Sequence, residues 1–169
     1  MSRIVVAVVI AGLLVPATEA ARIPRIPTRQ TPAHAQRWSR TDRSAAEFMV
    51  TLVRQKLTDQ NVAAWQALHP AHQLVAPLDS FAACQSSIPS MGELVVVRAM
   101  RVESGPVWIA GESASVPSKA VTVRVAVRVD PWPDPVVVVQ TMHAVSISGD
   151  WRWILSASQY EAFSSGSCP

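Results

Sequence analysis

The stretch VTVRVAVRV, residues 121–129, has the clearest periodicity in the chain. Its valines occupy every second position, and Thr122, Arg124, Ala126 and Arg128 occupy the positions between them. Successive side chains of a strand point to opposite faces, so this alternation predicts a strand with one apolar and one solvent-facing side. A sheet that packs on helices with one face and meets water with the other is typical of antiparallel pairing.

Further strands are predicted on both sides of this stretch. A proline-rich connection, DPWPDP, separates it from VVVVQTMHAVSI, and Gly149-Asp150 then predicts a tight turn into WRWIL. A weaker extended run, VWIAGESASV, is interrupted by Gly111. The expected strands cover residues 93–103, 107–116, 121–129, 136–147 and 151–155.

Before residue 91 the period is that of a helix. Residues 41–57 place apolar side chains at three- and four-residue spacing, which makes one apolar stripe. The expected capping box of this helix is formed by Ser44 and Glu47, and Thr41 and Asp42 are the alternative caps. Helices followed by a run of strands predict the α+β class. Two shorter helices are expected over residues 59–70 and 77–87.

The N-terminus has the pattern of a cleaved export signal. Arg3 supplies a positive start, residues 4–15 form an apolar run, and the small residues up to Ala20 offer a cleavage site. The run is shorter than the roughly 20 apolar residues that span a bilayer. We therefore expect a signal peptide over residues 1–20 and no transmembrane helix in the mature protein. The alternative is a buried N-terminal strand or helix.

Residues 21–40 are rich in arginine and proline and contain no acidic residue. Such a segment cannot bury enough apolar area to offset the entropy cost of ordering it. We therefore expect a disordered linker over residues 21–40 and a single α+β domain over residues 41–169. The alternative is that the linker is a basic arm that binds anionic polymer in the cell envelope.

The net charge of +3 is concentrated in these N-terminal segments. From Thr41 onward, nine Lys and Arg residues stand against eleven Asp and Glu residues, which leaves the expected domain near −2. A nucleic-acid-binding domain carries a basic patch or stripe, so we expect no nucleic-acid partner. With 49% hydrophobic and 16% charged residues, the chain has the composition of a globular protein.

The order of the expected elements carries a family resemblance. Helices that bear AAWQALHP and FAAC precede long strands that end in GDWRWIL. Over residues 41–163 this order resembles the nuclear-transport-factor-two-like superfamily of cone-shaped, cystatin-like folds, and in particular its secreted bacterial members. The resemblance implies N-terminal helices packed on a curved antiparallel sheet around an apolar cup. It implies no single activity, because isomerases, dehydratases and cyclases share the superfamily with members that catalyse nothing.

Cys84 and Cys168 are the two cysteines of the chain. In an exported protein, two cysteines are most simply one disulfide bond. This bond would join the helical layer to the chain end just past the last strand. Free thiols and an intermolecular bridge are the alternatives.

We predict no catalytic residue, and we expect His143 to be a hydrogen-bonded structural histidine. The alternative is that His143 is a polar group in the cup, because an isomerase or dehydratase of this fold needs an acid or base in an apolar surrounding and His143 lies in the middle of an expected strand. On the period of two, His143 shares a face with Val139, Thr141, Val145 and Ile147.

Other possible sites are weaker. His69 and His72 are three residues apart, as metal ligands can be, but Pro70 lies between them and no third ligand is evident. We therefore expect no metal and no cofactor, and a capping or surface role for both histidines. Trp132, between two prolines, is expected to fold onto the sheet as a lid, with an exposed partner contact as the alternative.

These observations predict a secreted or cell-envelope protein whose domain is a non-catalytic binding or structural module. Its partner would be a small apolar ligand or a cell-envelope protein, and it would be a monomer or a homodimer. The alternative is a small cofactor-free enzyme, isomerase- or dehydratase-like, that acts on an apolar ligand in the cup. A cup filled by Trp, Met and Val side chains favours the module, whereas inward-facing polar pairs favour the enzyme.

Overall fold

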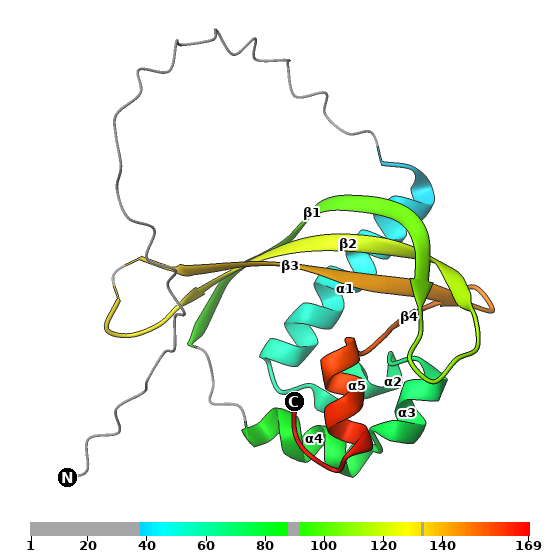
Figure 1. Ribbon diagram of the computed structural model, residues 1–169. Helices are drawn as coiled ribbons and strands as arrows, with labels where there is room; N and C mark the ends of the chain where they lie inside the picture. The colour runs from blue at the N-terminus through cyan, green and yellow to red at the C-terminus, as the bar shows by residue number, and fades with distance from the viewer. Residues whose placement is uncertain (1–37, 88–91, 133) are drawn as a thin grey trace, which may run out of the picture. The chain divides into compact units, whose positions relative to one another are not determined.

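The computed structural model describes residues 38–87, 92–132 and 134–169 (Figure 1). Within these residues, helices precede an antiparallel sheet and a short helix follows it, which confirms the predicted α+β class. The expected signal peptide and most of the expected linker lie outside the described residues. The helices are α1 (Arg40–Leu57), α2 (Asn61–Gln66), α3 (Pro70–Val75), α4 (Leu78–Ser87) and α5 (Ala157–Ser164). The strands are β1 (Glu93–Trp108), β2 (Ser115–Arg128), β3 (Val136–Ile147) and β4 (Asp150–Trp153).

Helix α1 begins earlier than expected, and its cap is Ser39. The Ser39 side chain accepts from the backbone N–H of Asp42, and the Asp42 carboxylate accepts from the backbone N–H of Ser39 at 3.0 Å. The expected capping box at Ser44 is therefore wrong, because Ser39 already closes the first turn. Ser44 instead accepts a hydrogen bond from the indole N–H of Trp151 at 2.9 Å. The predicted apolar stripe is confirmed, with Ala45, Ala46, Met49, Leu52 and Val53 buried.

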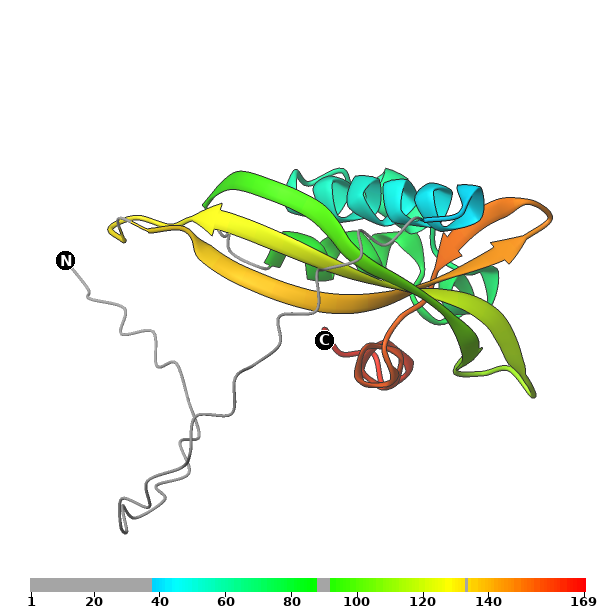
Figure 2. The same cartoon turned by 90° about the horizontal axis from the view of Figure 1, so that it is seen from above.

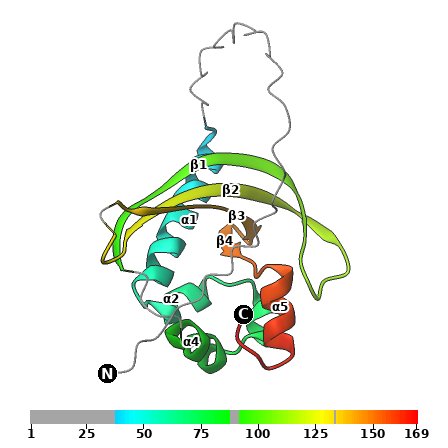
Figure 3. The same cartoon turned by 60° about the vertical axis from the view of Figure 1, so that its left-hand side comes forward.

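The strands pair in the order β1-β2-β3-β4, each antiparallel to the next. Figure 3 shows the sheet arching over the helices. We call the side that packs on α1 the inner face and the opposite side the outer face. The alternation in β2 is confirmed, because its odd-numbered valines lie buried on the inner face. These are Val121, Val123, Val125 and Val127.

The separate strand expected over residues 107–116 is wrong. Residues 107 and 108 continue β1, residues 115 and 116 begin β2, and Gly111 lies in the turn between the two strands. Gly111 has φ +86°, and a Cβ there would lie 2.7 Å from the Tyr160 hydroxyl. The glycine therefore permits both the turn and the close approach of α5.

The core lies between the inner face and the helices. Trp151 and Trp153 share the inner face of β4, and Trp153 is 1% exposed. The Trp153 indole N–H donates to the carbonyl of Ala64 at 2.8 Å. Its backbone N–H donates to the carbonyl of Ala67 at 3.0 Å, and its carbonyl accepts from the N–H of His69 at 2.8 Å. This one residue therefore joins the last strand to the helical layer by packing and by hydrogen bonds.

Two helices differ from the sequence-based expectation. Pro70 was expected to end one helix, but it is the first residue of α3, where a missing N–H costs nothing. Helix α5 was not expected. Its capping box is formed by Ser156 and Gln159, a spacing that is visible in the sequence.

The predicted disulfide bond is confirmed between Cys84 on α4 and Cys168 beyond α5, with the Cα atoms 5.3 Å apart. Phe163 of α5 also lies beside Phe81 of α4, with ring centroids 6.2 Å apart. The bond and this contact together hold the C-terminal helix against the helical layer. Over the described ranges, no helix combines the length and the apolar character needed to cross a membrane.

Candidate functional site

An apolar row crosses the outer face of the sheet near the end where β1 begins. Cross-strand pairing places Val96 opposite Ala126, and Ala126 opposite Val137. Val96 and Val137 are 41% and 46% exposed. Val139, two positions farther along β3 on the same face, is 60% exposed. Val96 of β1 and the two valines of β3 thus flank Ala126 of β2, which is 8% exposed, and their side chains are exposed apolar groups on the outer face.

A charged row lies directly beside this apolar row. Arg98 of β1 is opposite Arg124 of β2, and Arg124 is opposite Val139 of β3. Arg98 is exposed and Arg124 is half-buried. Like charges directly opposite each other on a sheet are destabilising. The pair therefore has an electrostatic cost that a bound anion could remove.

The neighbouring arginines of the outer face have carboxylate partners. Arg101 forms an ion pair with Glu103 at 2.5 Å, and Arg128 forms one with Glu93 at 2.7 Å. Within the described ranges, no such partner faces the Arg98–Arg124 pair. The two uncompensated positive charges of this face therefore lie together, next to exposed valines.

Residues 136–143 of β3 also form an open strand edge. Strand β4 pairs with β3 at residues 144–147, and no described strand lies beside the rest of β3. Over this first half of β3, Figure 2 shows β1 and β2 between β3 and α1. Val138 and Gln140, which point to the inner face, are nevertheless exposed. The edge is therefore accessible from both faces of the sheet.

The structure places His143 on the outer face, whereas Trp153 and the core lie on the inner face. Its Nδ1 atom is 3.1 Å from the Ser118 hydroxyl, which donates to the carbonyl of Gly105 at 2.9 Å. Because a hydroxyl has one proton, Ser118 accepts from His143, the reverse of what an activated serine needs. Burial lowers the pKa of His143, which favours the neutral ring. This geometry matches a hydrogen-bonded structural histidine.

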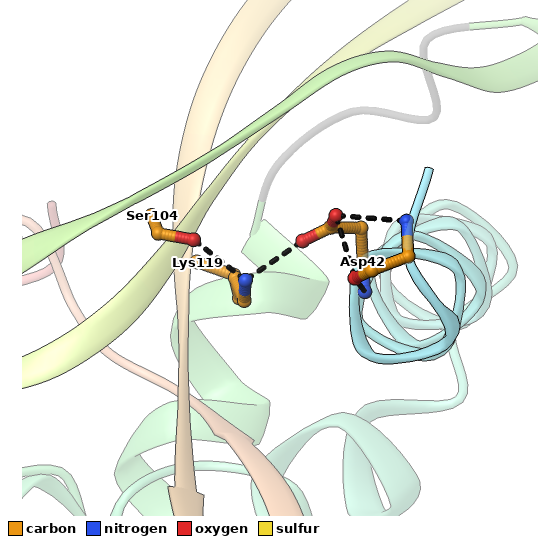
Figure 4. Close-up of polar contacts among 4 residues, drawn as sticks. Asp42, Ser104 and Lys119 are labelled. Atoms are coloured by element: carbon orange, nitrogen blue, oxygen red, sulfur yellow. Dashed lines mark hydrogen bonds and ion pairs between the residues drawn. The ribbon is translucent and has the colours of Figure 1, made fainter. Parts of the chain in front are cut away.

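A partly buried ion pair connects α1 to the sheet (Figure 4). Lys119 of β2 donates to Asp42 of α1 at 2.7 Å and to Ser104 of β1 at 2.6 Å. The hydrogen bond from Lys119, with a second from Ser39, lowers the pKa of Asp42 to about 2. Lys119 also borders an open depression lined by residues 104–106 and 115–119. Since its ammonium is already neutralised by Asp42, this depression offers no free charge to an anion.

His69, the N-cap of α3, and His72 within α3 have structural roles. The Nδ1 atom of His69 accepts from the N–H of Ala71 at 3.3 Å, which confirms the expected capping role. His72 is fully buried, so a surface role is wrong for it. Its Nδ1 accepts from the N–H of Leu155 at 2.8 Å, and its Nε2–H donates to the carbonyl of Ala110 at 3.1 Å. The described part of the chain holds no cluster of three potential metal ligands.

Lys56 is a feature that the sequence analysis missed. Its ammonium lies over the Trp153 ring, 4.7 Å from the centroid, and burial lowers its pKa. The residue belongs to the last turn of α1, where a cation is favoured by the helix dipole. The helix end and the ring together account for a cation in this position.

Trp132 lies at the turn between β2 and β3, and the expectation that it folds onto the sheet is wrong. Its backbone N–H donates to the carbonyl of Val129 at 2.9 Å, which closes the turn, and its side chain is 60% exposed. The turn holds the ring beyond the last paired residues of β2 and β3, Val127 and Val136. The exposed alternative is the one that the geometry supports.

The chain was compared with protein-family models, curated proteins and solved structures. None of them matches. No residue role is therefore transferred from another protein. The outer-face surface formed by the Arg98–Arg124 pair, the exposed valines and the open edge of β3 is the candidate functional site.

Proposed function

We propose that this chain is a secreted or cell-envelope protein whose domain is a non-catalytic binding module. The observation that carries the proposal is that the inner face is filled where the helices pack on it. Met49 and Val121 are 0% exposed, and Trp153 is 1% exposed. A ligand in the cup would have to displace these side chains, at a cost of several kcal/mol for each large apolar group. Binding at the exposed outer face has no such cost.

We also propose that the fold is of the cone-shaped, nuclear-transport-factor-two-like kind. The support is the order of the elements and the curvature of the sheet over α1 (Figure 3). Under this proposal the cup of the superfamily is occupied by the protein's own core. The alternative, an isomerase- or dehydratase-like enzyme with His143 as its polar group, needs an open cup, and His143 faces away from the inner side.

The test is whether a small apolar probe enters the inner face. Benzene titrated into the native protein and followed by NMR should cause no saturable shift at core methyl groups. Met49→Ala removes a fully buried side chain and should create a dry apolar cavity that binds benzene. Met100→Ala is the matched control, because Met100 is 47% exposed. Saturable binding to the native protein would contradict the filled cup and favour the enzyme.

The export part of the proposal has a separate test. The Cys84–Cys168 bond is compatible with an oxidising, extracellular location. The charged start, apolar run and small-residue site predict that the mature chain begins at Ala21. N-terminal sequencing of protein recovered outside the cytoplasm checks this. An intact Met1 on membrane-bound protein would contradict it.

A further inference from the structure

We propose that the open edge of β3 binds an extended acidic polypeptide, which adds to the sheet as a strand beside residues 136–143. This inference rests on the proposed function, because it names the surface and the partner class of the binding module. It is carried by three observations: the openness of the edge, the absence of charge along it, and the uncompensated arginine pair next to it.

The two long edges of the sheet differ. β1 has two register shifts, at Leu94/Val96 and Ala99/Arg101, and carries charged side chains along its length. Bulges and charges are the usual devices that stop an edge from pairing with another chain. The edge of β1 is thus protected in the way that natural sheets protect edges.

The edge of β3 has neither device. Its pairing with β2 runs without a register shift from Val136 to Val145, and residues 136–142 read VVVVQTM, with no charge and no proline. Every second residue of such a strand turns its N–H and C=O away from the paired neighbour. Residues 136–143 therefore present a continuous, uncharged ladder about 26 Å long, at roughly 3.3 Å per residue.

The positive charges of Arg98 and Arg124 on the outer face favour an acidic partner. A residue of the added strand opposite Val139 would lie on the outer face, in one row with Arg98 and Arg124. Two strand spacings, about 9.6 Å, would separate its backbone from that of Arg124. A glutamate and an arginine side chain can together span that distance. An acidic residue there would compensate the opposed arginines, while apolar residues on the other side would contact Val138.

A second copy of this chain fits the site less well. Antiparallel pairing of β3 with its own copy would place only uncharged side chains opposite residues 136–142. The Arg98–Arg124 pair would then stay uncompensated. Charge complementarity therefore favours a different, acidic chain over self-association.

The experiment uses the full mature chain and three labelled peptides. The first, TVEVEVEVT, has glutamate on one face and valine on the other. The second replaces each glutamate by lysine. The third keeps the glutamates but is N-methylated at alternate backbone positions, which removes the ladder hydrogen bonds. Fluorescence anisotropy should show the glutamate peptide binding at least about tenfold more tightly than the other two, and this preference should weaken as salt is added.

Two variants locate the site. Arg124→Glu should reverse the preference toward the lysine peptide. Arg101→Glu is the matched control, because Arg101 lies on the same face of the sheet but already has an acidic partner. This variant should prefer the glutamate peptide as the native protein does.

Equal binding of the peptides, or no binding, would overturn the proposal. So would a concentration-dependent dimer in sedimentation velocity that the glutamate peptide dissociates, because a second copy would then be the occupant. None of these outcomes bears on the filled inner face, which the benzene experiment tests separately.

Discussion

At the scale of single residues, the ion pair between Asp42 and Lys119 is the charged link between α1 and the sheet among the described residues. The side chains are 21% and 18% exposed, in contrast to 61% and 51% for Arg101 and Glu103. We expect a double-mutant cycle of Asp42→Asn and Lys119→Met to give a coupling of about 1 to 2 kcal/mol in urea unfolding. The exposed pair, tested with Arg101→Met and Glu103→Gln, should give less than about 0.5 kcal/mol. Equal couplings would contradict the role of burial.

The same pair predicts a pH dependence. The folded-state pKa of Asp42 is lowered from 3.8 to about 2, so its contribution to stability is complete above 3.8 and is lost as the pH falls through about 2. Unfolding free energies measured between pH 5 and pH 2 should therefore fall less steeply for Asp42→Asn than for the native protein. Parallel curves would count against the lowered pKa.

His72 predicts a second loss of stability, at higher pH. Burial lowers its pKa from the ordinary 6.5, because it disfavours the charged ring, and the hydrogen bond to the Ala110 carbonyl opposes this shift. A proton on Nδ1 would also displace the hydrogen bond from the N–H of Leu155. The unfolded state then binds more protons than the folded state below pH 6.5, so stability should decrease as the pH falls below this value. Two neighbouring titratable groups also act on this pKa: His69 lowers it further and Glu112 opposes the shift.

The measurement is chemical unfolding at pH 7.5 and pH 5. His72→Gln should lower the unfolding free energy by about 1 to 3 kcal/mol at pH 7.5, because it leaves buried backbone groups imperfectly paired. The variant should also lose less of its unfolding free energy between pH 7.5 and pH 5 than the native protein does. His69→Gln is the matched control. Burial lowers the pKa of His69 too, but its ring is only half-buried, so His69 should contribute less to the change of the unfolding free energy with pH. An unchanged slope in His72→Gln would assign the pH dependence to other groups.

Residue roles of this kind could be predicted from the sequence only in part. The disulfide partners followed from cysteine number alone, and the outward position of Arg124 followed from alternation. The role of His72 could not be predicted, because its partners are backbone groups 38 and 83 residues away. Nor could the opposition of Arg98 and Arg124, because it depends on the register that the bulge at Ala99/Arg101 sets.

At the scale of elements, hydrophobic periodicity predicted the long elements that show it clearly and did not predict the short ones. The valines of β2 and the apolar stripe of α1 are each long enough for the period to be unambiguous. α3 and α5 are short, at six and eight residues, so their identity depends on caps and tertiary contacts. The capping box at Ser156 and Gln159 was the available signal for α5, and the one at Ser39 and Asp42 was the available signal for the start of α1.

The start of α1 determines how much of the N-terminal segment can be deleted without a loss of stability. From its composition we expect residues 21–37 to be dispensable, so their deletion should leave the melting temperature nearly unchanged. Deletion of residues 21–40 should lower it by about 3 to 8 °C, because it removes the Ser39 cap, worth about 1 kcal/mol, and also Trp38. Trp38 packs against the core in the structure. Differential scanning calorimetry of the two deletions checks this, and equal melting temperatures would contradict it.

At the scale of the whole molecule, the C-terminal end is held by the bond between Cys84 and Cys168, which are 84 residues apart. A cross-link over a separation of this size constrains the unfolded chain strongly, and removal of a native bond in a small secreted domain costs about 2 to 5 kcal/mol. The sheet and α1 do not depend on the bond, because their contacts come from the valines of β2, the stripe of α1 and Trp153. α5 depends on it most, since its other anchors are two side chains, Phe163 beside Phe81 and Tyr160 beside His72.

We therefore expect Cys84→Ser/Cys168→Ser to lower the unfolding free energy by about 2 to 5 kcal/mol while the circular-dichroism spectrum at low temperature stays close to native. In hydrogen exchange, the amides of α5 should lose protection before those of β2, because the helix is released from α4 while the strand remains paired on both sides. The native protein with its disulfide reduced in place is the matched control and should behave as the double variant does. Mass spectrometry of unreduced, alkylated protein verifies the starting state. Two alkylated thiols, a disulfide-linked dimer, or simultaneous loss of protection in α5 and β2 would each contradict this account of how the chain end is held.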